Sequence, residues 1–450
     1  SDMKEANPIE LAEYAQSRDL QSEPAFAWWT KHVLKKRKII INKVRARMTK
    51  KHMKFGIDVP TTVLEAERLD TLNKNDFWSK AIAKELKNVI VAFQLLEDGE
   101  QIPVGSKHIG YHFIFDVKFD LTRKARLVAD GHRHKDVPSH LTYSSVASRE
   151  SVRMGFLLAA LNGLDIMACD IGNAYLNAPN REKVHVTVGP ELFGKEHEGK
   201  KAIIIRALYG LKSAGAAWRA MFANALQNEL GYHSCPADPD VWMKAKTKKN
   251  GEKYYSYLIV YVDDVLCIDE APKQIINHIG ELFRIKEGSD EEPKIYLGAN
   301  IRKWNVTDTE GMETQCWAMS SHGYAKEAVR IVEAQMLKHS LSYPSSRRHG
   351  SKSPFSSSSY RPELDYSDLC SDELATLYME LIGMLRWMCE LGRLDILYET
   401  AILSQYMASP RTGHLSQLLN IFKYVKTHDR RSWLVFDPMS YEVEWIPFAD

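Results

Sequence analysis

The 450-residue chain has only six cysteines and no long apolar run. The cysteines are scattered singly, so the sequence supports neither a disulfide framework nor a zinc site built on paired cysteines. No stretch approaches the roughly 18 apolar residues that a transmembrane helix needs, and the N-terminus lacks an apolar signal core. We therefore expect a protein of a reducing compartment, cytoplasmic and without a membrane partner.

The chain also has almost no excess charge. Its 60 Lys and Arg residues balance 58 Asp and Glu residues, and 44% of all residues are hydrophobic. This composition is typical of soluble globular proteins and excludes wholesale disorder. The length suggests about three structural units.

Positive charge is nevertheless concentrated in one place. Residues 31–54 contain eleven Lys and Arg residues and no acidic residue. Such a segment favours a polyanionic partner, although a solvated helix face or a flexible arm is an equal alternative. The residues that we expect to contact nucleic acid are Lys35, Lys36, Arg37, Lys38, Arg45 and Arg47.

Hydrophobic periodicity outlines the secondary structure of an α/β (α+β) protein. Apolar residues at intervals of three and four predict helices over 71–96, 151–163, 214–230 and 373–427. Alternating residues predict a β-hairpin over 108–129 with its turn at 120–123. The Ser-rich segment 340–359 is typical of a flexible tether.

Two apolar segments lead to carboxylates. The short strand 166–169 ends at Asp170, and the strands within 255–268 meet at Asp263 and Asp264. Adjacent ionised carboxylates among apolar residues repel one another and lose solvation, so a divalent cation is the simplest compensation. For the Asp-Asp pair alone, an exposed turn is the alternative. With Asp170 added, the set suits two Mg²⁺ or Mn²⁺ ions about 4 Å apart.

These segments resemble a known family. Residues 261–264 (Tyr-Val-Asp-Asp) and 168–176 resemble motifs C and A of reverse transcriptases. Residues 207–218 are similar to the Leu-Tyr-Gly-Leu-Lys signature of copia-like (Pseudoviridae) LTR retrotransposon polymerases. The resemblance covers about 76–450 and includes, in consistent order, the segments 124–131, 296–298, 382–387 and 391–396.

The resemblance implies a right-hand polymerase with fingers, palm and helical thumb. Its implied parts are a basic N-terminal extension at 1–70, fingers and the start of the palm at 71–165, a palm at 166–304 with a fingers insertion at about 177–212, a helical thumb and short connection at 305–435 with the tether at 340–360, and the start of a truncated RNase H domain at 436–450. RNase H chemistry needs several carboxylates around its metal ions, and the resemblance places only Asp450 among them here, so we expect no RNase H activity.

The resemblance also implies residue roles. Asp170, Asp263 and Asp264 would bind the two metal ions, with the carbonyl oxygen of Ile171 as a further ligand. The ring of Tyr175 would collide with a ribose 2′-hydroxyl and so exclude ribonucleotides. A core tyrosine packed under the strand is the alternative for Tyr175.

Further residues are implied to hold the nucleotide and the primer. Lys124 and Arg126, on one face of the hairpin, would neutralise triphosphate oxygens, unless they are merely solvent-facing cations. The remaining implied residues are Tyr209, Gly210 and Lys212 in the nucleotide pocket, Lys286 as a candidate acid for pyrophosphate departure, and Leu297 and Gly298 in the primer grip.

The predicted function is RNA-directed and DNA-directed DNA synthesis by a retrotransposon Pol protein. Its partners would be an RNA or DNA template, a DNA or RNA primer, deoxynucleoside triphosphates, and a second copy or integrase and RNase H segments, within virus-like particles. The alternatives are a catalytically inactive domesticated nucleic-acid-binding protein and an RNA-directed RNA polymerase. Tyr175 opposes the RNA polymerase, because its ring should exclude ribonucleotides.

Overall fold

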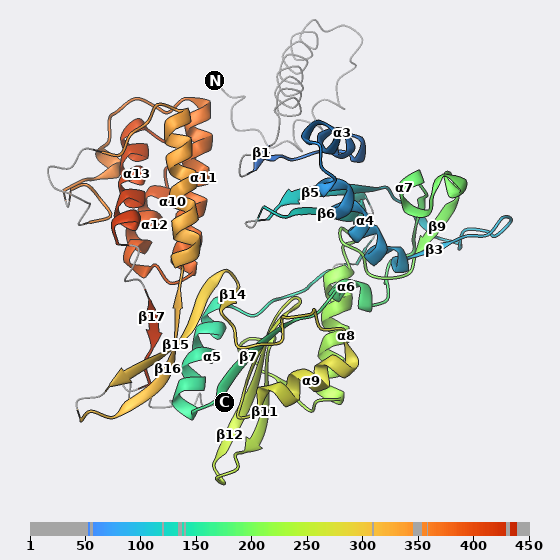
Figure 1. Cartoon of the computed structure of the whole chain (residues 1–450), viewed down its shortest axis with the longest axis horizontal. Helices are drawn as coiled ribbons and strands as arrows, with labels where there is room; N and C mark the ends of the chain where they lie inside the picture. Colours follow the sequence, from blue (N-terminus) through green and yellow to red (C-terminus); the bar gives the residue numbers. More distant parts are fainter. Residues whose placement is uncertain are drawn as a thin grey trace, which may run out of the picture. The chain divides into compact units, whose positions relative to one another are not determined.

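The computed structural model describes residues 53–54, 57–118, 121–133, 137–138, 141–307, 310–344, 353–357, 359–428 and 433–438 (Figure 1). The six predicted arm residues and Asp450 lie outside these ranges. The chain divides into two units, one formed by 1–82 with 114–125 and the other by 83–113 with 126–450. Within the described ranges, no helix is both long and apolar enough to cross a membrane.

The first unit contains β1 (Met53–Lys54), β2 (Ile57–Asp58), α3 (Val63–Asn73) and the start of α4 (Phe77–Val89). Helix α3 ends where Lys74 adopts a left-handed φ of 51°. Helix α4 then begins, because Asp70 accepts hydrogen bonds from the backbone N–H groups of Trp78 and Ser79 at 3.1 and 2.8 Å. The helix predicted over 71–96 is therefore confirmed for 77–89, but its bounds are wrong: α3 ends before it, and a 3₁₀ turn and the strand β3 follow it.

The predicted hairpin is confirmed as β5 (Tyr111–Val117) and β6 (Arg123–Ala129). Its base belongs to the second unit and its tip to the first. Along β6, Ala125, Leu127 and Ala129 are buried, while Lys124 and Arg126 alternate with them. The two cations therefore share the other face of the strand, as the alternation predicted.

The second unit is built on a five-stranded antiparallel sheet. Its strands follow the order β10 (His233–Ser234), β11 (Val241–Thr247), β12 (Lys253–Tyr261), β13 (Asp264–Asp269) and β7 (Asp165–Asp170). Figure 1 shows α5 (Arg149–Asn162) and α9 (Pro272–Leu282) on opposite sides of this sheet. Helix α5 ends at Gly163, whose φ is 56°, and packs Phe156 against Leu266 and Ile268 in one core.

Smaller elements complete this half of the second unit. Another sheet joins β3 (Phe93–Leu95), β9 (Lys201–Ile204), β8 (Val184–Thr187) and β4 (Lys107–His108). The other helices of this half are α6 (Ala174–Asn177), α7 (Pro190–Phe193), α8 (Ala214–Asn228) and the 3₁₀ turns Ile90–Ala92, Gly131–Arg133 and Lys195–His197; the 3₁₀ turns Pro362–Leu364 and Leu394–Ile396 belong to the C-terminal half. The predicted helix over 214–230 is thus confirmed to within two residues.

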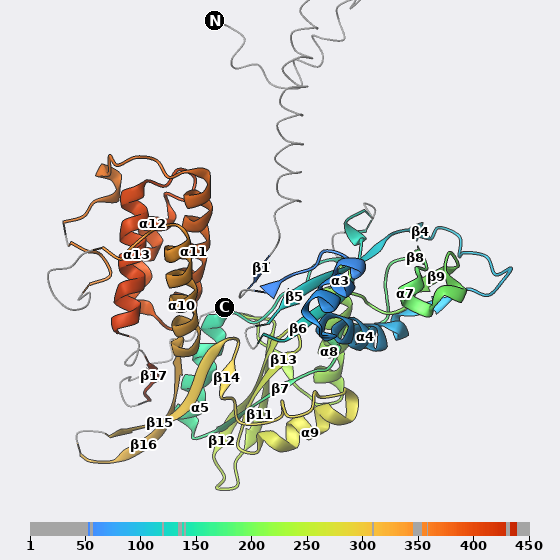
Figure 2. The ribbon, with the colours of Figure 1, turned by 45° about the horizontal axis from the view of Figure 1, so that its top comes forward.

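The C-terminal half combines a third sheet with a helical bundle, as Figure 2 shows. The sheet contains β14 (Ile295–Tyr296), β15 (Ala299–Thr307), β16 (Glu313–Ser320) and β17 (Leu434–Phe436). The bundle contains α10 (His322–Lys338), α11 (Asp372–Glu390), α12 (Leu397–Ser404) and α13 (Thr412–Thr427), which share one apolar core. The helical prediction for 373–427 is confirmed, whereas α10 was not predicted.

Part of the predicted tether is attached to the bundle. The amide oxygen of Gln417 accepts hydrogen bonds from the backbone and the hydroxyl of Ser356, both at 3.0 Å. The amide nitrogen of Asn420 donates to the carbonyl oxygen of Pro354 at 2.8 Å. Residues 353–357 of the predicted flexible tether are therefore attached to α13, whose polar side chains bind their backbone.

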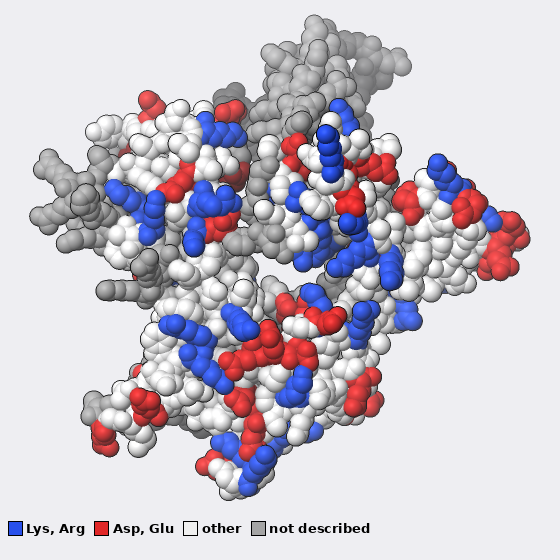
Figure 3. Space-filling model, in the orientation of Figure 1, with Lys and Arg blue, Asp and Glu red and all other residues white. Residues whose placement is uncertain are grey.

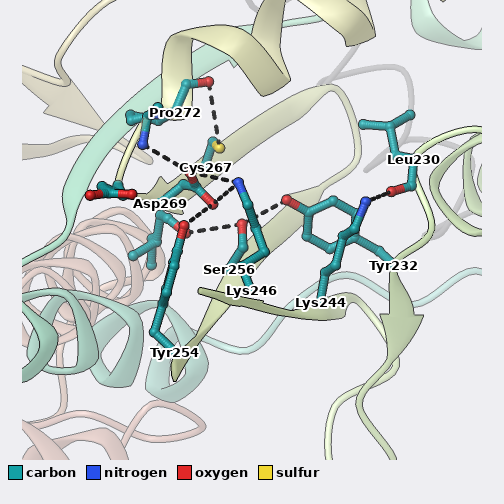
Figure 4. Close-up of polar contacts among 12 residues, drawn as sticks. Leu230, Tyr232, Lys244, Lys246, Tyr254, Ser256, Cys267, Asp269 and Pro272 are labelled. Atoms are coloured by element: carbon teal, nitrogen blue, oxygen red, sulfur yellow. Dashed lines mark hydrogen bonds and ion pairs between the residues drawn. The ribbon is translucent and has the colours of Figure 1, made fainter. Parts of the chain in front are cut away.

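A buried polar network surrounds Asp269, the last residue of β13 (Figure 4). The completely buried Asp269 carboxylate accepts hydrogen bonds from Lys246 Nζ at 2.8 and 3.0 Å, from the Tyr254 hydroxyl at 3.2 Å and from the Ala271 backbone at 2.8 Å. Burial opposes ionisation, but these hydrogen bonds outweigh it and lower the pKa of Asp269. This end of the strand holds a compensated carboxylate.

Candidate carboxylate site and its surroundings

The three predicted aspartates meet at the other end of the same strand. Strands β13 and β7 are antiparallel neighbours in which Asp264 lies directly opposite Asp170. Opposed residues in adjacent strands project from the same face, with Cβ atoms about 5 Å apart. Asp263 occupies the turn that joins β12 to β13. The structure therefore brings together all three side chains.

Backbone contacts tie this turn to β7. The N–H group of Ile171 donates to the carbonyl oxygen of Asp263 at 2.8 Å. Val262, immediately before Asp263, has a φ of 61°, a left-handed conformation that β-branched residues rarely adopt. Ile171 itself is completely buried, and the role of its carbonyl oxygen as a metal ligand stays a prediction.

Charges within the site shift the pKa values of Asp264 and Lys286. Burial, followed by the charges of Asp263 and Asp170, raises the pKa of Asp264 to about 6. Lys286 Nζ lies 2.6 Å from Asp170 Oδ2, and the Lys286 backbone N–H donates to the Asp170 carbonyl oxygen at 2.9 Å. This hydrogen bond to Asp170 is the largest cause of the raised pKa of Lys286. The predicted lysine therefore lies in the site, with its proton held firmly.

The donor set suits a hard divalent cation. Carboxylate oxygens are the ligands that Mg²⁺ and Mn²⁺ prefer. Among the described residues, however, no three His, Cys, Asp or Glu side chains already stand at metal-ligand spacing. Asp170 is instead paired with Lys286. The residue types therefore fit a divalent cation, but binding it would require Asp170 to leave Lys286 and the carboxylates to reorient.

An aromatic pair lies beside the carboxylates. The ring of Tyr175, in α6, lies 4.8 Å from that of Tyr209, and the Arg126 guanidinium lies 5.0 Å from the centre of the Tyr209 ring. Burial raises the pKa of Tyr175, and the charge of Asp263 raises it further. The structure therefore brings Tyr175, Tyr209 and Arg126 together near the site. Lys124 belongs to the first unit.

Gly210 allows a close approach between the Tyr209 loop and β6. Its φ is 91°, and a Cβ atom there would collide with the carbonyl oxygen of Ala129. The Ala129 N–H group donates to the Tyr209 carbonyl oxygen at 2.7 Å. Lys212 is exposed in the same loop. Gly210 thus has a packing reason to be glycine, and a contact with nucleotide stays a prediction.

The predicted primer-grip residues form the turn between β14 and β15. Leu297 and Gly298 have φ values of 46° and 86°, as a two-residue hairpin turn with two left-handed positions requires. A Cβ atom on Gly298 would lie 3.6 Å from Nε1 of Trp387 in α11. The turn therefore packs against the helical bundle. A role of Leu297 and Gly298 in gripping the primer stays a prediction.

Two residues at the site were missed by the sequence analysis. The hydroxyl oxygen of Ser289 accepts a hydrogen bond from the Asp170 backbone at 3.0 Å. The indole N–H of Trp218 donates to the Val262 carbonyl oxygen at 2.7 Å. Trp218 lies in the segment that resembles the copia-like signature, but only the fold shows which backbone group its indole meets.

Exposed cations lie on the helical bundle. Figure 3 shows Lys and Arg side chains over its visible face. The exposed cations of the bundle helices include Lys326, Arg330, Lys338, Arg386 and Lys426. Arg330 and Lys426 are paired with Glu327 and Glu333. The bundle therefore offers positive charge from more than one helix.

Comparison with known proteins identifies the domain. Residues 98–318 match the family model described as reverse transcriptase (RNA-dependent DNA polymerase). The chain is 24% identical over 397 residues to the retrovirus-related Pol polyprotein from transposon RE1 of Arabidopsis thaliana, which covers 85% of this chain and 25% of that protein. It is also 24% identical over 335 residues to the Pol polyprotein from transposon TNT 1-94 of Nicotiana tabacum, covering 72% of this chain and 24% of that protein.

A yeast relative extends the comparison. The chain is 27% identical over 199 residues to the transposon Ty1-DR1 Gag-Pol polyprotein of Saccharomyces cerevisiae, covering 42% of this chain and 11% of that protein. The chain spans about a quarter of the length of the two plant relatives. Its relatives are thus copia-type Pol polyproteins, and residues 98–318, which carry all three aspartates, form a domain of the reverse transcriptase family.

Proposed function

We propose that this chain is an RNA-directed and DNA-directed DNA polymerase, part of an LTR retrotransposon Pol polyprotein. The observation that carries the proposal is the meeting of Asp170, Asp263 and Asp264 within the reverse transcriptase domain. The raised pKa of Asp264 supports it, because closely spaced carboxylates that disfavour one another's ionisation suit a site that receives cations.

The three carboxylates, with the carbonyl oxygen of Ile171, would hold two Mg²⁺ or Mn²⁺ ions. When bound, such ions activate the primer 3′-oxygen and neutralise the leaving pyrophosphate. Lys286 holds Asp170 through its ion pair and retains a proton that it can donate to pyrophosphate. Tyr175, backed by Tyr209, excludes a ribose 2′-hydroxyl, and Arg126 offers a guanidinium to the triphosphate.

The proposal includes a right-hand arrangement of the chain. The five-stranded sheet would be the palm within 166–304, and the bundle α10–α13 would be the thumb within 305–435. Residues 71–165 and 177–212 would form the fingers, preceded by the basic extension 1–70 and followed by the start of an RNase H domain at 436–450. Two features support this assignment: the carboxylates lie at a strand end, and the bundle follows them in the chain.

Template and primer would bind through positive charge on the bundle and through the arm at 31–54. Neutralising phosphates releases counterions, so affinity should fall steeply as salt rises. Deleting 31–54 should weaken template–primer binding at moderate salt without changing the rate of single-nucleotide incorporation. Equal affinity with and without the segment would make the arm irrelevant to binding.

The test of the function is extension of a DNA primer on an RNA template with all four deoxynucleotides and Mg²⁺. The wild-type chain should extend the primer, and the Asp263→Asn variant should not. Tight template–primer binding without extension by either protein would indicate a nucleic-acid-binding protein instead. Preferential use of ribonucleotides would indicate an RNA polymerase.

A further inference from the structure

We propose that Trp218 is a positioning residue that holds the carboxylate turn through its indole N–H group. The inference rests on the proposed polymerase function and assigns a role to a residue behind the site. Trp218 lies in α8 and is 2% exposed, so it cannot contact nucleotide or nucleic acid. Whatever it contributes must act through the groups that it touches.

The turn that Trp218 touches is strained. Val262 has a φ of 61°, where its β-branched side chain crowds the backbone. Such conformations persist only when the surroundings hold them. Val262 directly precedes Asp263, so any relaxation of its backbone changes the direction of the Asp263 side chain.

The indole supplies one such hold. Trp218 Nε1 donates to the Val262 carbonyl oxygen at 2.7 Å, a short N–H···O distance. A second hydrogen bond fixes the next peptide group of the turn, where the Ile171 N–H group donates to the Asp263 carbonyl oxygen at 2.8 Å. The two hydrogen bonds fix successive carbonyl groups of the turn, one from α8 and one from the end of β7.

Aromatic packing fixes the indole itself. The Trp218 ring is stacked on Phe222 at 5.2 Å, and Phe283 meets its edge at 5.4 Å. Phe283 is followed by Arg284, whose carbonyl oxygen accepts a hydrogen bond from Gly172 at 2.8 Å, and then by the segment that carries Lys286. The same aromatic cluster therefore lies behind both the Val262 turn and the segment that pairs with Asp170.

Packing and hydrogen bonding can be separated by substitution. Trp218→Phe keeps an aromatic ring against Phe222 and Phe283 but removes the donor. We expect the single-turnover rate of deoxynucleotide incorporation to fall about tenfold or more, while the Kd of the template–primer stays unchanged. Trp317→Phe, at a tryptophan that is 3% exposed in β16, is the matched control and should leave the rate within about twofold.

A double-mutant cycle tests the route of the effect. In a Val262→Gly background the left-handed conformation carries no steric cost, so adding Trp218→Phe should change the rate less than about twofold. An equal loss in both backgrounds would show that the indole does not act through the strained turn. A wild-type rate in the single Trp218→Phe variant would overturn the inference while leaving the polymerase function intact.

A second replacement keeps the proposal testable if Trp218→Phe does not fold. Benzothienylalanine at position 218 has the shape of tryptophan and carries sulfur in place of the N–H group. It should reproduce the loss of rate, and full activity with it would overturn the inference. An inactive wild-type chain under the same conditions would instead contradict the proposed function, which separates the two failures.

Discussion

The two ends of β13 carry the same residue type in opposite electrostatic situations. At one end, Asp269 is completely buried, and hydrogen bonds from Lys246, Tyr254 and Ala271 satisfy its oxygens. At the other, burial and two neighbouring carboxylates raise the pKa of Asp264 to about 6. The ends are five residues apart, about 16 Å along the strand, and face opposite sides of the sheet.

The comparison separates a carboxylate that stabilises the fold from carboxylates that the fold must tolerate. Sequence alone does not separate them, since each aspartate terminates an apolar strand. The structure does: Asp269 accepts hydrogen bonds from Lys246 and from the backbone just before α9, and its pKa is lowered, whereas the pKa of Asp264 is raised although Lys286 pairs with the neighbouring Asp170. A carboxyl pKa raised by burial and by two neighbouring carboxylates is the feature on which we base the proposed metal site.

The largest expected effect is on catalysis at the Asp264 end. Asp264→Asn should lower the rate of primer extension by about a thousandfold or more, because it removes a charge that the proposed metal ions require. The measurement is single-nucleotide incorporation on an RNA template. Asp290→Asn, which breaks the partly exposed ion pair with Lys273, is the control and should leave the rate unchanged. A fully active Asp264→Asn variant would contradict the claim that the Asp264 end of β13 serves catalysis.

The next effect is on stability at the Asp269 end. Asp269→Asn should destabilise the fold by about 3 kcal/mol, because it leaves Lys246 without its anionic partner in a largely buried network. Urea unfolding of the variant and the wild-type chain measures this loss. The folded variant should still extend a primer at low temperature. If Asp269→Asn abolished primer extension and left the stability unchanged, Asp269 would act in catalysis and not in stabilising the fold.

A smaller effect concerns sugar discrimination. Tyr175→Val should raise ribonucleotide incorporation relative to deoxynucleotide incorporation by about tenfold or more, because the ring near Asp263 no longer meets the 2′-hydroxyl. Tyr254→Phe, which removes a hydroxyl from the Asp269 network, is the matched control at the other end. Steady-state incorporation of both nucleotide types gives the ratio. If Tyr175→Val rejected ribonucleotides as strongly as the wild-type chain, Tyr175 would be a core packing residue and not a sugar filter.

The smallest effect is the acid dependence of the Asp269 contribution. A carboxyl group whose pKa is lowered in the folded state stabilises the fold above its unfolded pKa of about 3.9, and that contribution is lost as pH falls through the folded pKa. The stability difference between wild type and Asp269→Asn should therefore be constant near neutrality and shrink below about pH 4. Urea unfolding midpoints of the wild-type chain and Asp269→Asn, measured across pH, test this. A stability difference that grows on acidification would contradict a lowered pKa of Asp269.

The sequence predicted those features that depend on local pattern. The alternation in 108–129 and the apolar strands around Asp170 and Asp263 were sufficient to predict the hairpin and the three aspartates, and the family resemblance added the roles. The break between α3 and α4 was missed because Asp70 caps α4 from a distance in the chain. The anchoring of 353–357 and the contact of Trp218 with Val262 were missed because they depend on tertiary hydrogen bonds.

The most direct test of the contrast is the free energy of unfolding of Asp264→Asn beside that of Asp269→Asn. The account predicts opposite signs. Asp264→Asn should gain about 1 kcal/mol at neutral pH, less than its full pKa shift implies because the carboxyl is partly exposed, whereas Asp269→Asn should lose about 3 kcal/mol. Destabilisation by both substitutions would contradict the claim that the fold tolerates Asp264 for the sake of function.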